Sequence, residues 1–263
     1  MDDLVTYLKT IRTTPKLEKV NKVVVAISGG LDSTTLLHFL LRFYGKDQVI
    51  PVSFDYDQRH SVELEAAAHT LRSLGLIKKW IQVDLSRVGQ QAALISSMVK
   101  GDVKTPTMED VLGEPQPVTY FPFRNLVISS ILASIAESHG CNGIAIGSNP
   151  YVDSHLVWDG TIQFYDALQH ILDMNRKNSI QMLLPYAELT KAEIVQLGVE
   201  LNVDFTNCWT CYSPVAEDED VAYPVLFPCE VCPACKPRAA AFRTLGIVDP
   251  LLAKGFDTKP TEI

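Results

Sequence analysis

The pattern of hydrophobic and polar positions alternates between two kinds of segment. Residues 22–27 and 49–54 are short apolar runs without in-and-out alternation, which is typical of strands buried on both faces of a sheet. Between them, residues 33–44 place leucines at helical spacing. Strands that alternate with helices of this length form βαβ units, so the pattern predicts an α/β fold built on a doubly wound, Rossmann-like parallel sheet. Further strands are predicted at 79–83 and 143–147, and further helices at 63–74, 124–138, 164–174 and 191–201.

Three regions fall outside this alternation. Residues 1–20 place Leu4, Leu8 and Ile11 on one face of a helical extension that ends near Thr13–Pro15 and packs on its own domain or docks a partner. Residues 87–119 are irregular and proline-containing, which favours an insertion or cover over the sheet. After Phe205 the chain changes to cysteines, prolines and short turns. We therefore expect an extension (1–20), a main domain (21–205) and a small C-terminal module (206–263).

Charge and hydropathy narrow the class of protein. The 263 residues carry a net charge of −8 and no run of lysines or arginines, which argues against nucleic-acid binding and favours a small-molecule substrate. The acidic run 217–220 is typical of a solvated loop, with a docking site as the alternative. No stretch reaches the roughly 18 apolar residues that a membrane span needs, and the first residues lack the basic start of a signal peptide. We expect a cytoplasmic protein without a membrane partner.

The hexapeptide Ser28–Ser33 (SGGLDS) lies between the first predicted strand and the first predicted helix. Ligands bind at this edge of a parallel sheet, and a helix N-terminus there favours anions. The two glycines allow the backbone amides to turn inward, while Ser28 and Ser33 add hydroxyl donors. A helix cap with two turn glycines would explain only part of the hexapeptide, and the spacing does not fit a Walker A loop. The hexapeptide therefore predicts a phosphate-binding loop.

Five of the six cysteines lie close together near the C-terminus, in the order Cys208, Cys211, Cys229, Cys232 and Cys235. Two-residue spacers allow neighbouring thiolates to converge on one ion, and four thiolates form a closed, structural zinc site. A [4Fe–4S] cluster is the alternative, since such spacings also occur in ferredoxins. Five cysteines compete for four positions, so spacing alone leaves the choice of ligands open.

The hexapeptide resembles the fingerprint of the PP-loop ATP pyrophosphatases, whose domain belongs to the adenine nucleotide alpha hydrolase-like group. These enzymes activate a carbonyl or carboxylate as an adenylate and release pyrophosphate. More specifically, several segments in order resemble the 7-cyano-7-deazaguanine synthase (QueC) family of queuosine biosynthesis, and together they span about residues 23–250. They are 28–35, 54–60 (FDYDQRH), 121–125 (FPFRN), 147–149 (GSN), 189–194 (LTKAEI), 209–212 (WTCY), the cysteine pattern 229–235, and 246–250 (GIVDP).

The resemblance implies an ATP-dependent ligase that forms C–N bonds. It would convert 7-carboxy-7-deazaguanine and ammonia to the nitrile preQ₀ through adenylate and amide intermediates. It also implies Mg²⁺ on the ATP phosphates, a homodimer, and structural Zn²⁺ on Cys211, Cys229, Cys232 and Cys235, which leaves Cys208 as a spare thiol. The implied ATP-binding residues are Ile27, Ser28, Gly29, Gly30, Leu31, Asp32, Ser33, Thr34, Thr35, Leu36 and Leu37.

Chemical reasoning assigns roles to the residues that match the family pattern. Departing pyrophosphate needs a cation, for which Lys191 is the candidate, with an ordinary exposed lysine as its alternative. Arg124 and Asn125 open a helix and face the anionic substrate, or only cap that helix. Arg59 and His60 border the nucleotide, or belong to a solvated loop. The expected catalytic residues are Lys191, Arg124 and Asp32, and the expected substrate-binding residues are Arg59, His60, Asn125, Asn149 and Asp159.

The chain also departs from the family pattern. Asp57 stands where the family usually has glycine, and residues 157–161 lack the family's cysteine and arginine. The loop between Cys211 and Cys229 is longer than usual, and the extension 1–20 is additional. These departures keep a second function open, in which a QueC-like enzyme of an antiviral defence system joins a 7-deazaguanine to a protein amine. A nucleotide sensor or zinc scaffold that binds ATP without turnover is the third alternative.

Overall fold

The computed structural model describes residues 14–148, 158–218 and 220–259. Its centre is a parallel sheet in the order β3-β2-β1-β4-β5. β1 pairs on one side with β2 and on the other with β4, with Val23 opposite both Val49 and Gly143. The prediction of a doubly wound parallel sheet is therefore confirmed. The strands are β1 (Val23–Ala26), β2 (Val49–Asp55), β3 (Ile81–Asp84), β4 (Gly143–Ala145) and β5 (Gln181–Leu183).

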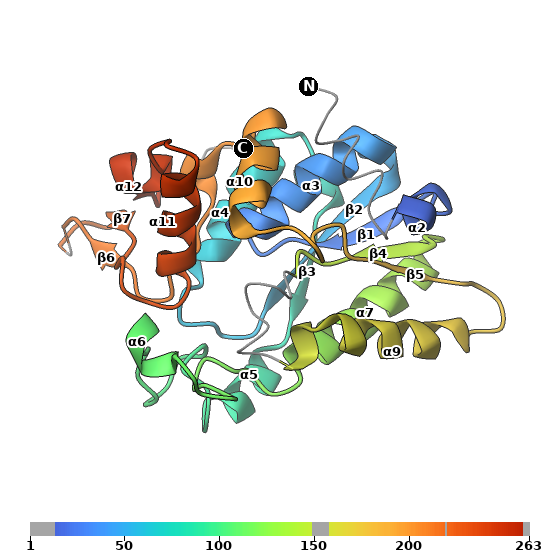
Figure 1. Ribbon diagram of the computed structural model, residues 1–263, viewed down its shortest axis with the longest axis horizontal. Coiled ribbons are helices and arrows are strands. Elements are labelled where there is room, and N and C mark those ends of the chain that lie inside the picture. Colours follow the sequence, from blue (N-terminus) through green and yellow to red (C-terminus); the bar gives the residue numbers. More distant parts are fainter. Residues whose placement is uncertain (1–13, 149–157, 219, 260–263) are drawn as a thin grey trace.

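Helices cover both faces of the sheet (Figure 1). Successive residues of β1 point to opposite sides, so Val23 and Val25 join one hydrophobic core while Val24 joins the other. This placement explains the continuous apolar run at 22–27, because a strand covered on both sides has no polar face. One face carries α3 (Leu31–Tyr44), α4 (Val62–Ser73) and α10 (Lys191–Glu200), and the other carries α7 (Arg124–Ser138) and α9 (Ile162–Asp173).

The predicted elements of the main domain are present, with boundaries shifted by a few residues. Sequence analysis missed β5, which has only three residues. The expected cover contains α5 (Ser86–Ala92) and α6 (Met108–Val111), with the segment 97–103 between them. Three-residue 3₁₀ helices complete the domain: η1 (Lys46–Gln48), η2 (Ile77–Lys79), η3 (Trp158–Gly160) and η4 (Phe205–Asn207).

A short helix that sequence analysis did not predict, α2 (Thr14–Glu18), begins at the segment where the helical extension was expected to end. The expected helix before it lies outside the described residues. Proline is tolerated in the first turn of a helix because its missing N–H has no intrahelical acceptor at that position. Leu17 of α2 is buried, and its carbonyl accepts a hydrogen bond from the Tyr44 hydroxyl at 2.7 Å. Leu4, Leu8 and Ile11 lie outside the described residues.

The cysteine-rich region forms a small antiparallel sheet and two helices beside α10. A buried ion pair stabilises this region, because Arg238 of α11 contacts both carboxylate oxygens of Asp249, at 2.6 and 2.8 Å. The same guanidinium donates to the carbonyls of Phe205 and Cys208, which joins the region to the end of the main domain. Its elements are β6 (Val215–Ala216), β7 (Val225–Phe227), α11 (Cys235–Thr244), α12 (Pro250–Lys254) and β8 (Phe256–Asp257).

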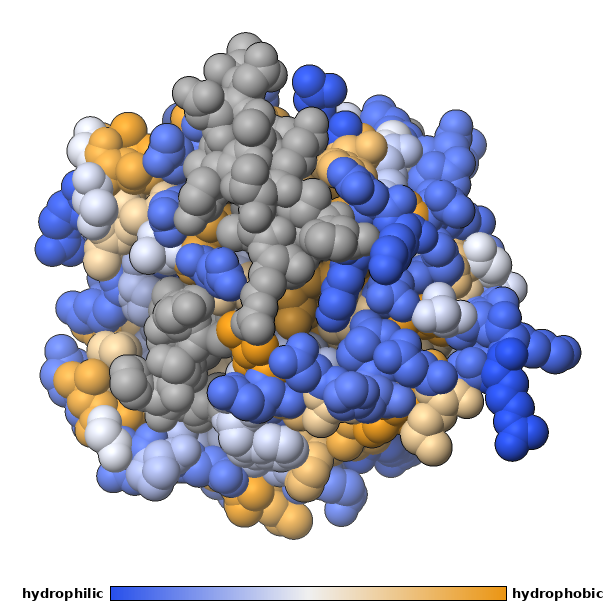
Figure 2. Space-filling model, turned by 45° about the vertical axis from the view of Figure 1, so that its right-hand side comes forward, coloured by the Kyte–Doolittle hydropathy of each residue, from blue (hydrophilic) through white to orange (hydrophobic). Residues whose placement is uncertain are grey.

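Figure 2 shows hydrophilic residues over much of the described surface on the side that it brings forward, with apolar residues in separate patches. Among the described residues, no helix is both long and apolar enough to cross a membrane. The largely apolar segment 126–136 belongs to α7, which packs against β1 and β4 and contributes Leu132 and Ala136 to the core. The apolar residues of α7 therefore contribute to the hydrophobic core.

Candidate active site and metal centre

A cavity of about 260 Å³ lies at the carboxyl ends of β1, β2 and β4. The strand order reverses between β1 and β4, which is the position where open α/β sheets bind ligands. One end of the cavity is the loop Ser28–Ser33, which we call the phosphate loop. We call the opposite end of the cavity the base end. Its lining residues are Phe54, Tyr56, His60, Glu63, Met98, Arg124, Asn125 and Tyr212.

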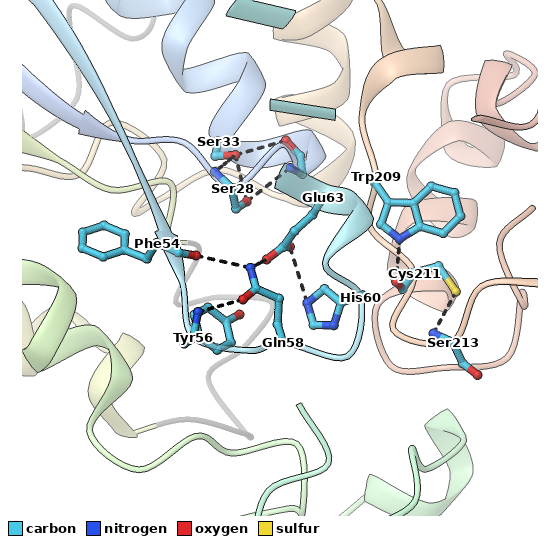
Figure 3. Close-up of polar contacts among 11 residues, drawn as sticks. Ser28, Ser33, Phe54, Tyr56, Gln58, His60, Glu63, Trp209, Cys211 and Ser213 are labelled. Atoms are coloured by element: carbon cyan, nitrogen blue, oxygen red, sulfur yellow. Dashed lines mark hydrogen bonds and ion pairs between the residues drawn. The ribbon is translucent and has the colours of Figure 1, made fainter. Parts of the chain in front are cut away.

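The phosphate loop is tied by its own serines (Figure 3). Ser33 Oγ accepts from the Ser28 amide at 3.1 Å and lies 3.0 Å from Ser28 Oγ, which itself accepts from the Gly30 amide at 3.2 Å. Gly30, the N-cap of α3, has no side chain that could accept a hydrogen bond from the first-turn amides of this helix. An anion bound there would meet backbone donors and the positive end of the helix dipole.

Gly29 is required by both its conformation and its neighbours. Its φ of +88° lies in the region that favours glycine, and a Cβ at this position would lie 2.0 Å from the carbonyl oxygen of Glu63. The Gly29 carbonyl also accepts a hydrogen bond from the Trp209 amide at 2.9 Å. The loop is therefore fixed between the first turn of α4 and the segment that leads to the cysteines.

Lys191 is brought to the phosphate loop, where its Nζ forms an ion pair with Asp32 Oδ2. A capping box at the start of α10 holds it there, since Thr190 Oγ1 accepts from the Glu193 amide and Glu193 Oε2 accepts from the Thr190 amide. The other oxygen of Asp32, Oδ1, is buried without a hydrogen-bond partner. The loop thus presents both a cation and a free carboxylate oxygen.

Arg124 is half-buried at the base end, in the first turn of α7. Burial opposes its charge, but Tyr56, Tyr212 and Asp159 together raise the pKa of Arg124 above its ordinary value. Burial also raises the pKa of Tyr56, and a hydrogen bond with Arg124 partly offsets this rise. The site therefore holds a permanent positive charge next to the neutral Tyr56.

Asn125 and Asp159 face each other behind Arg124. The Asn125 amide donates to Asp159 Oδ2 at 3.0 Å, and Asn125 Nδ2 donates to the Asp159 carbonyl at 2.8 Å. Burial raises the pKa of Asp159, against the opposing effects of the Asn125 amide and the Arg124 charge. Asp159 Oδ1 is buried without a partner. This pair binds η3 to the start of α7, and Asn125 also lines the cavity.

Sequence analysis missed a polar group beside His60 that Figure 3 shows. Glu63, in the first turn of α4, lies between His60 Nε2 (3.4 Å) and Gln58 Nε2 (3.0 Å). Gln58 and Tyr56 belong to the segment 54–60 that carried the family resemblance, whereas Glu63 follows that segment. Its position three residues after His60 was the available signal, since a turn before α4 brings the two residues together, with the Glu63 amide donating to the His60 carbonyl at 3.0 Å.

Some expected ligand-binding residues lie away from the cavity. The guanidinium of Arg59 donates to the carbonyls of Ser97, Val99, Gly101 and Val103 at 2.7–3.3 Å, so in the structure it organises the segment 97–103. Thr35, Leu36 and Leu37 are fully buried, and the two leucines belong to the hydrophobic core. Of the eleven expected ATP-binding residues, those that line the cavity are Ile27, Ser28, Gly30, Leu31, Asp32 and Ser33. Asn149 lies outside the described residues.

Four cysteines converge in the C-terminal region, and they are the four that the family resemblance implied. The Sγ atoms of Cys211, Cys229, Cys232 and Cys235 all lie within 4.8 Å of one another. Cys211 Sγ accepts hydrogen bonds from the amides of Ser213 and Cys229 at 3.3 and 3.2 Å. This donor set fits a metal ion bound by four thiolates.

Cys208 is separate from that group. Its thiol is buried, contacts the Asp204 carbonyl at 3.5 Å, and burial raises its pKa to about 12. Trp209 and Thr210, which line the cavity, connect Cys208 to Cys211. The Trp209 ring is fully buried and donates through Nε1 to the Cys211 carbonyl at 2.8 Å. The cysteine group and the phosphate loop are thus joined through Trp209.

The parallel sheet, the phosphate loop and the C-terminal cysteine group together define a PP-loop nucleotide-binding protein with a potential metal centre. The family model described as "Queuosine biosynthesis protein QueC" matches residues 22–246. The chain therefore belongs to the QueC family.

Individual relatives agree with this assignment. A 7-cyano-7-deazaguanine synthase from Thermoplasma volcanium is 33% identical over 88% of this chain and 90% of its own length. Another protein of that name, from a Cyanothece species, is 35% identical over 88% of this chain and 98% of its own length. Among solved structures, the glutamine-dependent NAD⁺ synthetase of Acinetobacter baumannii has a TM-score of 0.47 and 15% identity, over 75% of this chain and 31% of that one. The expectation of a synthase-like enzyme is confirmed at the level of the family.

Proposed function

We propose that this protein uses ATP to convert 7-carboxy-7-deazaguanine and ammonia to 7-cyano-7-deazaguanine through an adenylate and an amide. The names of the relatives support the product. The observation that carries the proposal is the arrangement of charge in the cavity. The phosphate loop, whose Asp32 is paired with Lys191, lines one end, and the half-buried cation Arg124 lines the other. Adenylation brings together two anions, ATP and the substrate carboxylate, so the site needs a cation beside each of them.

At the phosphate end, Ser28, Gly30 and Ser33 would hold the ATP phosphates through amides and hydroxyls. Lys191 would neutralise the charge that develops as pyrophosphate departs, and Asp32 would position its ammonium group. The free Asp32 Oδ1 fits a hard cation, since Mg²⁺ prefers carboxylate oxygens. Bound Mg²⁺ would supply further neutralisation of the phosphates.

At the base end, Arg124 would bind the substrate carboxylate and orient it toward the α-phosphate. A guanidinium suits this task because it is permanently charged and bonds a carboxylate with two parallel N–H groups. Asn125 and Asp159 would fix the start of α7 and hence the position of Arg124. His60 would border the base, Arg59 would act through the segment 97–103, and Asn149 stays a predicted substrate contact.

We further propose that the four-cysteine group holds a structural Zn²⁺. Four thiolates leave no open coordination position, so the ion would stabilise the segment around Trp209 and Tyr212 without touching substrate. A homodimer, a cytoplasmic location and a protein amine as alternative acceptor stay predictions.

The experiment is mass spectrometry of the product after incubation with ATP, 7-carboxy-7-deazaguanine and ammonium, with pyrophosphate measured in parallel. We expect pyrophosphate that depends on the carboxylate substrate, and a product with the mass of the nitrile. An adenylate that accumulates with ammonia present, and that transfers to an added protein, would support the protein-amine alternative. Bound ATP without pyrophosphate release under any of these conditions would overturn the proposal in favour of a nucleotide sensor.

A further inference from the structure

One carboxylate in the cavity wall has no role in the activation chemistry proposed above. Glu63 lines the base end and is 8% exposed. A buried carboxylate is costly unless hydrogen-bond donors surround it. We infer that Glu63 recognises the substrate by accepting hydrogen bonds from adjacent N–H groups of a guanine-type base, namely the ring N–H and the exocyclic amino group. This inference rests on the proposed function.

The surroundings of Glu63 hold its carboxylate in one place. Gln58 is fully buried, accepts from the Tyr56 amide at 2.9 Å and donates to the Phe54 carbonyl at 3.2 Å. It has one remaining amide proton, which it donates to Glu63 Oε1 at 3.0 Å. Because the backbone of β2 and the following turn lock Gln58, this contact also fixes Glu63.

Both oxygens of Glu63 keep capacity for a further donor. Oε1 receives Gln58 and Oε2 lies 3.4 Å from His60 Nε2, whereas an ionised carboxylate can accept about four hydrogen bonds. Within the described part of the chain, Glu63 pairs with His60, and no lysine or arginine nitrogen lies within 4 Å of its carboxylate oxygens. Arg124 acts on Glu63 electrostatically without such a contact. A ligand with adjacent donors would therefore satisfy the group.

The rest of the base end suits a planar heterocycle. Phe54, Tyr56, Met98 and Tyr212 offer apolar and aromatic surface, while Arg124 supplies a cation. A 7-carboxy-7-deazaguanine carries a carboxylate on one ring and adjacent donors on the other, which is the complementary arrangement. An adenine ring offers one amino donor beside an acceptor nitrogen, and that acceptor would face the negative charge of Glu63. The wall thus favours the guanine-type base over adenine.

The test compares two substrates on the wild-type protein and on Glu63→Gln. One substrate is 7-carboxy-7-deazaguanine, and the other is the same molecule without the exocyclic amino group. Pyrophosphate release gives kcat/KM for each. We expect the wild type to prefer the amino-bearing substrate about 10- to 100-fold, as a charge-assisted hydrogen bond allows. In Glu63→Gln this preference should fall below about threefold, because an amide accepts such bonds less strongly.

Glu65→Gln is the matched control, since Glu65 lies on the same helix but is exposed, and it should keep the wild-type preference. The wild-type comparison needs no variant, so it tests the inference even if Glu63→Gln fails to fold. Equal use of both substrates by the wild type would overturn the inference while leaving the proposed function intact. If Glu63→Gln raised only the KM for ATP, Glu63 would contact the adenine ring instead, and the inference would be overturned. No pyrophosphate release by the wild type with the amino-bearing substrate would instead overturn the proposed function.

Discussion

The two ends of the cavity are built in different ways. The phosphate end comes from one continuous hexapeptide, Ser28–Ser33, together with Lys191. The base end combines side chains from β2, α4, α7 and the segment beside the cysteines. The first depends largely on backbone amides and two glycines, whereas the second depends on buried side chains that position one another. The comparison suggests that activation chemistry and base recognition can be disabled separately.

The largest expected effect concerns the metal. Cys232→Ser should remove most of the bound metal and lower the melting temperature strongly, because metal-binding free energy contributes to folding. Both ends of the cavity should lose their structure, since Trp209 contacts the phosphate loop and Tyr212 lines the base end. Metal content by mass spectrometry and melting temperature provide the measurement. Cys208→Ser is the control, and full loss of metal in that variant would show the choice of four ligands to be wrong. An absorbance near 400 nm would support an iron–sulfur cluster in place of zinc.

Lys191→Met should affect only the phosphate end. It keeps the length and apolar stem of the side chain, so α10 should stay folded. We expect turnover to fall by about 10²–10³, comparable to the loss of one transition-state donor, while ATP affinity changes by less than about tenfold. Steady-state kinetics and a separate ATP-binding titration distinguish these outcomes. Lost affinity with normal turnover at saturating ATP would make Lys191 a ground-state contact instead.

A smaller effect, measured on ATP binding, is expected from Gly29→Ala. Its Cβ would clash with the Glu63 carbonyl, so the loop or α4 must shift, and we expect ATP affinity to fall by about 10-fold or more. Gly75→Ala is the matched control, because Gly75 also has a positive φ (+67°) but nothing within 4 Å of the added carbon. Both variants should lose about 1 kcal/mol of stability to backbone strain, Gly29→Ala should lose more because of its clash, and only Gly29→Ala should weaken ATP binding. Equal ATP affinities for the two would contradict this reading of the loop.

The same comparison explains what could be predicted from the sequence. The phosphate loop, β1 and α3 follow from local residue types, because the glycines, the buried β-branched run and the leucine spacing each point to one structure. The choice of four cysteines also agreed with the observed group, although spacing alone left it open. Metal identity and the function of each predicted site residue stay predictions.

What could not be predicted depends on contacts between distant segments. β5 is three residues long and becomes a strand by pairing with β4, so its own pattern gave little signal. Arg59 carries a charge typical of a ligand contact, yet its partners are carbonyls about 40 residues later in the chain. Glu63 resembles any acidic residue in the first turn of a helix until Gln58 and His60 are placed around it.

The contact between Trp209 and Gly29 has a consequence for the order in which the protein is made. A ribosome releases the phosphate loop early, and the first strands and helices can then begin to pack. Trp209, Arg238 and Asp249 emerge much later, although they support the loop and the wall beside it. Nascent chains therefore carry an incomplete nucleotide site through most of their synthesis.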